Sequence, residues 1–173
     1  YDPGAVPGAA QRTFDGLPGS WCHIQESVID SGALASTLTE QRIEQVFYGA
    51  AVTSGPERER DTPESVLSIN LVGLATVAKL AAKAGIRRLI NLSSASAYGL
   101  PDGDESDWPP TLHEEHTRER PVSLYALSKF ATEITTRRIA ALTGLDALSV
   151  RLSSIFGPWE RDTGFRDTLS APL

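Results

Sequence analysis

Short apolar runs that alternate with long helical patterns constrain the fold of this chain more than any other feature. The runs lie at 46–51, 88–93 and 147–152, and the helical patterns lie between them at 62–84 and 123–143. This alternation is typical of a parallel sheet, because parallel strands need a long crossover connection. The pattern therefore predicts an α/β fold in which a parallel sheet has helices on both faces.

The two long helices have recognisable ends. Thr62 and Pro63 suit the N-cap and the first position of one helix. Gly85 and Gly144 stand where each helix would end in a left-handed conformation. Apolar residues occupy both flanks of the helix at 62–84, although a helix that lies on a sheet needs only one. We therefore expect this helix to have a second packing partner.

The rest of the chain gives weaker signals. The expected segments are a short helix at 9–15, a strand at 21–25, a helix at 31–42 and a charged, solvated loop at 54–61. Glu133 and Arg137 are four residues apart in the second long helix. This spacing predicts an ion pair on the helix surface.

Length and composition narrow the class of protein and its partners. The length suits one domain at 1–173, and the net charge of −6 argues against nucleic acid or an anionic membrane as partner. A single cysteine, Cys22, allows no internal disulfide, and His23, His113 and His116 lack the spacing of metal ligands. No apolar run reaches the length of a membrane span and no signal peptide is visible, so we expect a cytoplasmic protein.

Tyr125, Lys129 and Ser94 indicate a proton-transfer site. Residues four apart share a helix face, so the phenol and the ammonium can address one point. Ser94 follows the strand at 88–93, at the sheet edge where ligands bind in open parallel sheets. A free phenol has a pKa of about 10, and a nearby cation favours its deprotonated form. The three groups suit acid–base chemistry on an alcohol or carbonyl, although a lone Tyr-x-x-x-Lys also arises by chance.

Several motifs together resemble the extended short-chain dehydrogenase/reductases, the NAD-dependent epimerase/dehydratase family. In chain order they are Gly49-Ala50-Ala51, Asn70 in INLVGLATVAKLAAKAG, Leu92-Ser93-Ser94-Ala95-Ser96-Ala97-Tyr98-Gly99, Glu115, Tyr125-Ala126-Leu127-Ser128-Lys129 and Arg151-Leu152-Ser153-Ser154-Ile155-Phe156-Gly157-Pro158. They cover nearly the whole chain in the family's order and spacing. The resemblance implies a Rossmann-like fold, NAD as cofactor with NADP left open, and a small-molecule substrate, in particular a nucleotide sugar.

The resemblance also assigns roles by position. Tyr125 would exchange a proton with the substrate hydroxyl, Lys129 would lower the pKa of Tyr125, and Ser94 would orient the substrate oxygen. The implied cofactor-binding residues are Asp2, Ser27, Val28, Ala50, Ala51, Thr53, Lys129, Ser153 and Ile155. Asp2 would bind the adenine ribose, or it is only a turn residue at a frayed end. Asn70 is either part of the chemistry or, more simply, a residue that satisfies backbone groups at a helix kink.

Parts of the family pattern are missing from the sequence. No G-x-x-G-x-x-G turn occurs, and that turn holds the cofactor pyrophosphate in the family. There is no methionine and no segment for a C-terminal substrate lobe, so we expect a fragment of a longer protein that by itself lacks both sites, which leaves its own activity open. Ala95-Ser96 replaces the Asp-Glu pair of the sugar 4,6-dehydratases, which disfavours their elimination chemistry.

Three functions remain open from the sequence. The resemblance favours a sugar-nucleotide epimerase or related oxidoreductase that moves a hydride between a substrate carbinol and nicotinamide. A net NAD(P)-dependent reductase or dehydrogenase of a small carbonyl compound is the alternative enzyme, and a non-catalytic remnant or cofactor-sensing module is the alternative of another class. In the family the two long helices form a dimer's four-helix bundle, which implies a homodimer through 62–84 and 123–143.

Overall fold

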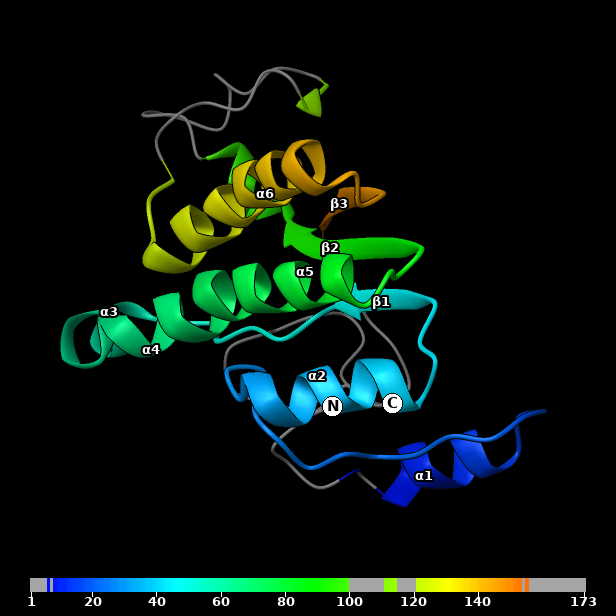
Figure 1. The fold of residues 1–173 in the computed structure, drawn as a ribbon. Helices are drawn as coiled ribbons and strands as arrows, with labels where there is room; N and C mark the ends of the chain where they lie inside the picture. Colours follow the sequence, from blue (N-terminus) through cyan, green and yellow to red (C-terminus); the bar gives the residue numbers. More distant parts are fainter. Residues whose placement is uncertain (1–5, 7, 100–110, 115–120, 154, 156–173) are drawn as a thin grey trace. The chain divides into compact units, whose positions relative to one another are not determined.

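The computed structural model describes residues 6, 8–99, 111–114, 121–153 and 155 (Figure 1). They belong to two compact units, a larger one at Val28–Ser153 and a smaller one at Tyr1–Ser27 with Ser154–Leu173. The elements of the larger unit are, in chain order, α2 (Ser31–Glu40), β1 (Gln45–Tyr48), α3 (Pro56–Asp61), α4 (Pro63–Leu67), the π-helix η1 (Ser68–Gly73), α5 (Leu74–Lys83), β2 (Arg88–Ser94), the 3₁₀ helix η2 (Ala95–Tyr98), α6 (Leu124–Thr143) and β3 (Ala147–Leu152).

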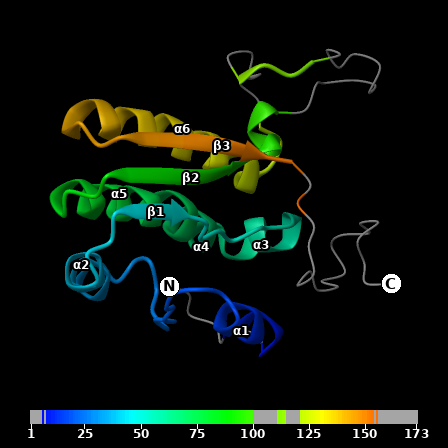
Figure 2. The same ribbon diagram turned by 90° about the vertical axis from the view of Figure 1, so that its right-hand side faces the viewer.

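The sheet of the larger unit is parallel, with β2 between β1 and β3 (Figure 2). Its register aligns Phe47 with Ile90 and Ile90 with Leu148. Helices connect β1 to β2 and β2 to β3, as parallel pairing requires. The predicted α/β class, the parallel sheet and the two long helices are therefore confirmed.

One face of this sheet is covered by α5 and α6 (Figure 1). Side chains of β2 alternate accordingly: Leu89 is fully buried, while its neighbour Ile90 points to the other face and is only partly buried. On that other face Phe47, Leu148 and Val150 are 63%, 40% and 37% exposed. Parallel sheets are ordinarily covered on both faces, and among the described residues this second face stays partly exposed.

The three pieces α4, η1 and α5 form one continuous helix with a π turn in its middle. Pro63 occupies its first position, as predicted, but the Thr62 side chain makes no capping hydrogen bond. In a π turn the main-chain hydrogen bonds shift by one residue, and here the Ile69 carbonyl accepts a hydrogen bond from the Tyr48 hydroxyl. Gly73 is required beside it, because a Cβ at that position would lie 2.5 Å from the Tyr48 hydroxyl oxygen.

This helix, Pro63–Lys83, is long and apolar enough to cross a membrane by length and composition alone. The sequence-based expectation that no run reaches that length is corrected accordingly. The core helix of a soluble protein meets the same criterion, and this helix packs against α6 with Val66, Leu74 and Val77 buried. The finding is therefore weak evidence for a membrane span.

The shorter helices test the weaker expectations. The helix expected at 31–42 is α2, and Asp30 caps it by accepting hydrogen bonds from the N–H groups of Gly32 and Ala33. The helix expected at 9–15 is α1 (Gly8–Asp15), which belongs to the smaller unit. Both predictions are confirmed.

The strand expected at 21–25 is wrong, because those residues form no strand. Trp21 instead contacts α1 within the smaller unit. Its indole Nε1 donates to Asp15 Oδ1 at 2.8 Å, and its ring centroid lies 5.4 Å from that of Phe14. An apolar pattern at Trp21 therefore reflects packing on a helix and not a place in the sheet.

Candidate active site

Helix α6 carries Tyr125 in its first turn and Lys129 in the next. Ser123 caps the helix, because its Oγ accepts a hydrogen bond from the Ala126 N–H at 3.1 Å. Gly144 ends the helix with a φ of 74°, as the sequence predicts. Tyr125 is partly buried and Lys129 is 4% exposed, so the lysine lies inside the fold and the tyrosine stays partly open to solvent.

The Lys129 ammonium lies inside the protein. Its Nζ donates to the Leu92 carbonyl at 2.7 Å and lies 5.8 Å from the centroid of the Tyr125 ring. Burial lowers the pKa of Lys129 to about 8, because desolvation disfavours the charged form. An ammonium has three N–H donors, and the described residues accept one of them. A buried cation, with two N–H donors that no described residue accepts, is thus placed beside a phenol ring.

The two serines at the end of β2 have different surroundings. The Ser93 hydroxyl is buried and donates to Glu133 Oε1 at 2.6 Å. Ser94 is partly exposed, and its Oγ accepts from the Ser96 N–H and donates to Ser96 Oγ, both at 3.2 Å. The hydroxyl of Ser94 is therefore the more available of the two, which supports the choice of Ser94 as the candidate.

Asn70 holds the loop that follows β1. Its Oδ1 accepts from the Val52 N–H at 2.7 Å, and its Nδ2 donates to the Val52 carbonyl at 3.1 Å and to Ser128 Oγ at 2.9 Å. Asn70 is 1% exposed and lies in the π turn. The interpretation of Asn70 as a residue that serves a helix kink is therefore corrected, because its amide binds the backbone of a different segment and a residue of α6.

The other predicted cofactor contacts are only partly brought to this site. Ala51 and Thr53 are exposed and Ala50 is partly exposed, and all three follow β1 at the carboxyl end of the sheet. Val28 is partly buried in the larger unit, where Ser153 is exposed just after β3. The remaining predicted residues are Ser27, partly buried, and Ile155, exposed, both in the smaller unit, and Asp2, which lies outside the described residues.

Glu133 forms an ion pair with Arg151 and not with Arg137, so the predicted surface pair is wrong. Arg151 Nε donates to Glu133 Oε1 at 2.8 Å and Nη2 donates to Oε2 at 2.7 Å. The two side chains are 8% and 9% exposed, whereas Arg137 is exposed. The register of β2 and β3 explains the difference, because it pairs Arg151 with Ser93, the residue that also binds Glu133.

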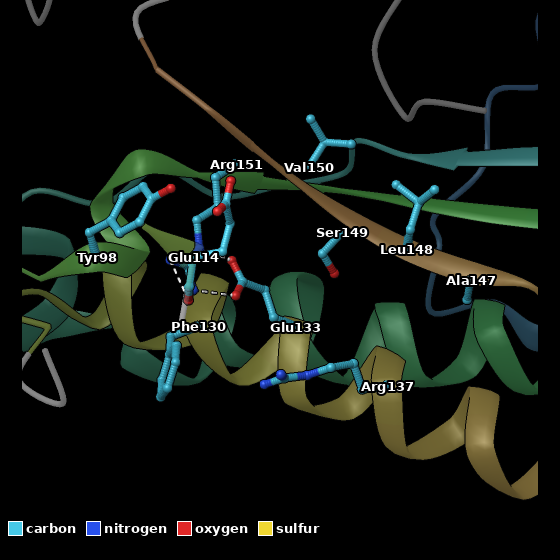
Figure 3. A pocket seen from close by; sticks show the side chains of 10 residues that line it. All are labelled: Tyr98, Glu114, Phe130, Glu133, Arg137, Ala147, Leu148, Ser149, Val150 and Arg151. Carbon is cyan, nitrogen blue, oxygen red and sulfur yellow. Dashed lines mark hydrogen bonds and ion pairs between the residues drawn. The ribbon is translucent and has the colours of Figure 1, made fainter. Parts of the chain in front are cut away.

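This ion pair lines a cavity of 690 Å³ beside β3 and α6 (Figure 3). The Arg151 guanidinium also lies 4.2 Å from the centroid of the Tyr98 ring. The hydrogen bond from Arg151 to Glu133 raises the pKa of Arg151. The pair therefore ties α6 to the ends of both β2 and β3, next to the turn that bears Ser94.

Glu59 is a residue of the site that the sequence did not reveal. The loop expected at 54–61 is wrong over most of its length, because α3 occupies Pro56–Asp61. Glu59 on this helix accepts hydrogen bonds from the N–H groups of Leu124 and Tyr125 at the start of α6. A run of alternating charges gives no signal that distinguishes one inward carboxylate from its solvated neighbours. Among the described residues, no three His, Cys, Asp or Glu side chains lie together as metal ligands.

The geometry defines the class of protein: an α/β, Rossmann-like domain with a partly buried tyrosine beside a buried lysine at the carboxyl edge of its sheet. A sequence model of the NAD dependent epimerase/dehydratase family matches residues 9–171. The chain belongs to this family.

Relatives and solved structures agree with that assignment. The UDP-glucose 4-epimerase of Mycolicibacterium smegmatis is 29% identical over 136 residues, which are 78% of this chain and 41% of that protein. The structure of UDP-glucose 4-epimerase from Thermotoga maritima with UDP-glucose is similar with a TM-score of 0.68 and 26% identity, over 78% of this chain and 42% of that one. DesIV of Streptomyces venezuelae, a dTDP-glucose 4,6-dehydratase solved with NAD, gives a TM-score of 0.72 and 25% identity, over 90% and 45%. The chain thus spans less than half the length of these relatives.

Proposed function

We propose that the protein is an NAD-dependent sugar-nucleotide epimerase or a related oxidoreductase, with Ser94, Tyr125 and Lys129 as its proton-transfer residues. One observation carries the proposal. Helix α6 sets Tyr125 and the buried ammonium of Lys129 on successive turns, and the hydrogen bond from Lys129 to Leu92 ties them to the strand that ends in Ser94. Family membership supports the reaction class, and the similarity to UDP-glucose 4-epimerases supports a nucleotide sugar as substrate.

The described residues fit the ribose–nicotinamide half of NAD. The loop at 50–53 lies at the carboxyl edge of a parallel sheet, where nucleotides bind. It offers small side chains at Ala50 and Ala51 and a backbone fixed by Asn70. Among the described residues, the Lys129 ammonium has two N–H donors without an acceptor, which are left for ribose hydroxyls. When bound there, NAD supplies the acceptor and donor of hydride for the substrate carbon.

The family resemblance adds further contacts to this proposal. We assign the remaining cofactor contacts to Asp2, Ser27, Val28, Thr53, Ser153 and Ile155. The whole chain, 1–173, would then be part of one NAD-binding domain.

Tyr125 moves the proton in this proposal. The Tyr125 oxygen takes the proton of the substrate hydroxyl as the carbon that bears this hydroxyl becomes a carbonyl. It returns the proton when the carbonyl is reduced again. The Lys129 ammonium lies 5.8 Å from the centroid of the Tyr125 ring, so its positive charge is beside the phenol during the reaction. Ser94 orients the substrate oxygen through its hydroxyl, which now binds Ser96 at the exposed end of β2.

The test uses the protein encoded by the complete reading frame that contains this chain. It is incubated with NAD and UDP-glucose, and sugar products and NADH absorbance are followed together. Formation of the 4-epimer without net NADH supports the proposal. Net NADH formation would indicate a dehydrogenase. A protein that binds no NAD in a titration would indicate a non-catalytic module. A titration of the 173 residues alone is expected to show weak binding, and tight binding would contradict the need for a glycine-rich turn.

We also propose a cytoplasmic homodimer formed through the helices at 62–84, which comprise α4, η1 and α5, and at 123–143, which is α6. The outer faces of the long helices expose Val72, Ile134 and Leu142, which are 54%, 47% and 66% exposed. A largely apolar groove of 560 Å³ lies between α5 and α6. A second copy of the same face would cover these side chains, because a two-fold interface is self-complementary.

Light scattering tests the proposed dimer. It should give twice the chain mass for the wild type, and Leu142→Glu should halve that mass because it places a charge in the interface. An unchanged mass in Leu142→Glu, or a monomeric wild type, would contradict this interface.

A further inference from the structure

Glu59 is the one residue of α3 that is partly buried. Its neighbours Glu57, Arg58, Arg60 and Asp61 are exposed. A single oxygen, Glu59 Oε1, accepts three hydrogen bonds. They come from Ser54 Oγ at 2.9 Å, from the Leu124 N–H at 2.8 Å and, at the longer distance of 3.4 Å, from the Tyr125 N–H. Ser54 is itself buried, so the carboxylate is directed by a fixed donor.

These contacts complete the start of α6. The first N–H groups of a helix have no acceptor within the helix. Ser123 serves the third of them, at Ala126, while Glu59 serves the first two, at Leu124 and Tyr125. A carboxylate is also favoured at this end of a helix by the helix dipole. Glu59, 65 residues away in the sequence from Leu124, thus holds the backbone that bears Tyr125.

A second tie joins the same two segments. Asn70 binds Val52 on one side and Ser128 on the other. The loop after β1 and the first turns of α6 are therefore connected by two separate sets of hydrogen bonds, one through Glu59 and one through Asn70. The two ties hold Val52 and Ser54, which flank Thr53, the last residue of the proposed cofactor loop.

We propose that Glu59 is a positioning residue for Tyr125: it fixes the first turn of α6 against the loop after β1, so that the phenol meets the substrate hydroxyl at the reacting distance. This inference rests on the proposed function. Reaction rates depend steeply on such placement, because a misplacement of about 1 Å costs roughly 100-fold in rate. Glu59 itself does not touch the reacting atoms in this account, and its effect passes through the Tyr125 backbone.

Three variants separate positioning from a general loss of stability. Glu59→Ala removes the acceptor, Glu59→Asp keeps the charge but ends about 1.5 Å short of the helix, and Glu59→Gln keeps an acceptor oxygen at the same length. The control is Glu57→Ala, which changes the same residue type on the same helix at an exposed position. Each variant is made in the complete reading frame, and kcat, KM and amide hydrogen exchange at Leu124 and Tyr125 are measured at a temperature where all variants are folded.

The expected result has two parts. Glu59→Ala and Glu59→Asp should lose exchange protection at Leu124 and Tyr125, and their kcat should fall by about 10- to 100-fold while KM stays within about threefold. Glu59→Gln should recover most of the protection and of kcat, and Glu57→Ala should match the wild type. If Glu59 were only a stabilising cap, its replacement would lower the melting temperature without changing the kcat of the folded fraction.

The outcomes distinguish this inference from the proposed function. Unchanged exchange at Leu124 and Tyr125 in Glu59→Ala would overturn the inference whatever the activity. Lost protection with an unchanged kcat would overturn the positioning role, as would failure of Glu59→Gln to restore kcat. A wild type without epimerase or dehydrogenase turnover would overturn the proposed function and with it the catalytic role of Glu59, and the exchange data would still decide whether Glu59 anchors α6.

Discussion

Replacing Arg151 with methionine should show how strongly the buried ion pair holds the site together. Arg151 and Glu133 are joined by two hydrogen bonds of 2.8 and 2.7 Å, and their side chains are 8% and 9% exposed. In Arg151→Met the Glu133 carboxylate stays buried, with the Ser93 hydroxyl as its remaining partner among the described residues. Removal of one partner from a buried pair costs about 3–5 kcal/mol. With a slope of about 2 kcal/mol per molar urea, the midpoint of urea unfolding should fall by roughly 2 M.

Two further variants make this test specific. Arg137→Met removes an exposed arginine one turn after Glu133 and should change the free energy of unfolding by less than about 0.5 kcal/mol. The double variant Glu133→Gln with Arg151→Met leaves no charge at the place of the ion pair, so it should be more stable than Arg151→Met alone. The reasoning is refuted if Arg151→Met costs no more than Arg137→Met, because the pair would then behave as a surface ion pair. It is equally refuted if the double variant gains nothing over Arg151→Met.

Two other substitutions test the surroundings of the candidate site. Burial lowers the pKa of Lys129 from 10.5 to about 8, so the folded wild type should gain stability as pH rises from about 8 to 10.5. In urea unfolding this gain should reach about 3 kcal/mol relative to Lys129→Met. A stability difference between the two proteins that does not change with pH would count against a buried ammonium. Gly73→Ala should destabilise by about 1–3 kcal/mol because its Cβ would meet the Tyr48 hydroxyl oxygen at 2.5 Å, and Tyr48→Phe in the same chain should recover part of that loss, so an equally stable Gly73→Ala would argue against this close contact.

Local chemistry explains why much of the fold was predictable from sequence. Ser123 and Gly144 mark the ends of α6 through capping and a left-handed turn, and both signals lie within a few residues of the helix they end. The parallel sheet follows from the alternation of apolar runs and helices, which depends on spacing alone. The same local reasoning placed Tyr125 and Lys129 on one helix face, and the 5.8 Å separation of the ammonium from the ring agrees with it.

The contacts that the sequence could not reveal join residues far apart in the chain. Glu133 has Arg137 at helical spacing, yet it binds Arg151, because β3 places Arg151 opposite Ser93 in the register with β2. The partner of Glu133 depends on the pairing of β2 with β3, and the sequence around Glu133 does not predict that pairing. The register of two strands, once known, would have identified Arg151 as the partner.

Glu59 was missed for a related reason. Its helix is a run of charges in which every residue suits solvent, and the acceptor role of Glu59 arises only when α6 begins beside it. The strand expected at 21–25 was wrong for a different reason. The apolar residue Trp21 packs on Phe14 of a helix and takes no place in the sheet. Periodicity thus predicted elements better than it predicted their partners.

The central claim is that Tyr125 transfers the proton while other residues bind the cofactor. The most direct measurement compares wild type and Tyr125→Phe, in the complete reading frame, by the single-turnover rate of UDP-glucose oxidation and by NAD affinity. Because general acid–base catalysis contributes about 100- to 10,000-fold, the account predicts a rate loss of that order with unchanged NAD affinity. A Tyr125→Phe protein that turns over at the wild-type rate, with NAD bound equally well, would contradict the account.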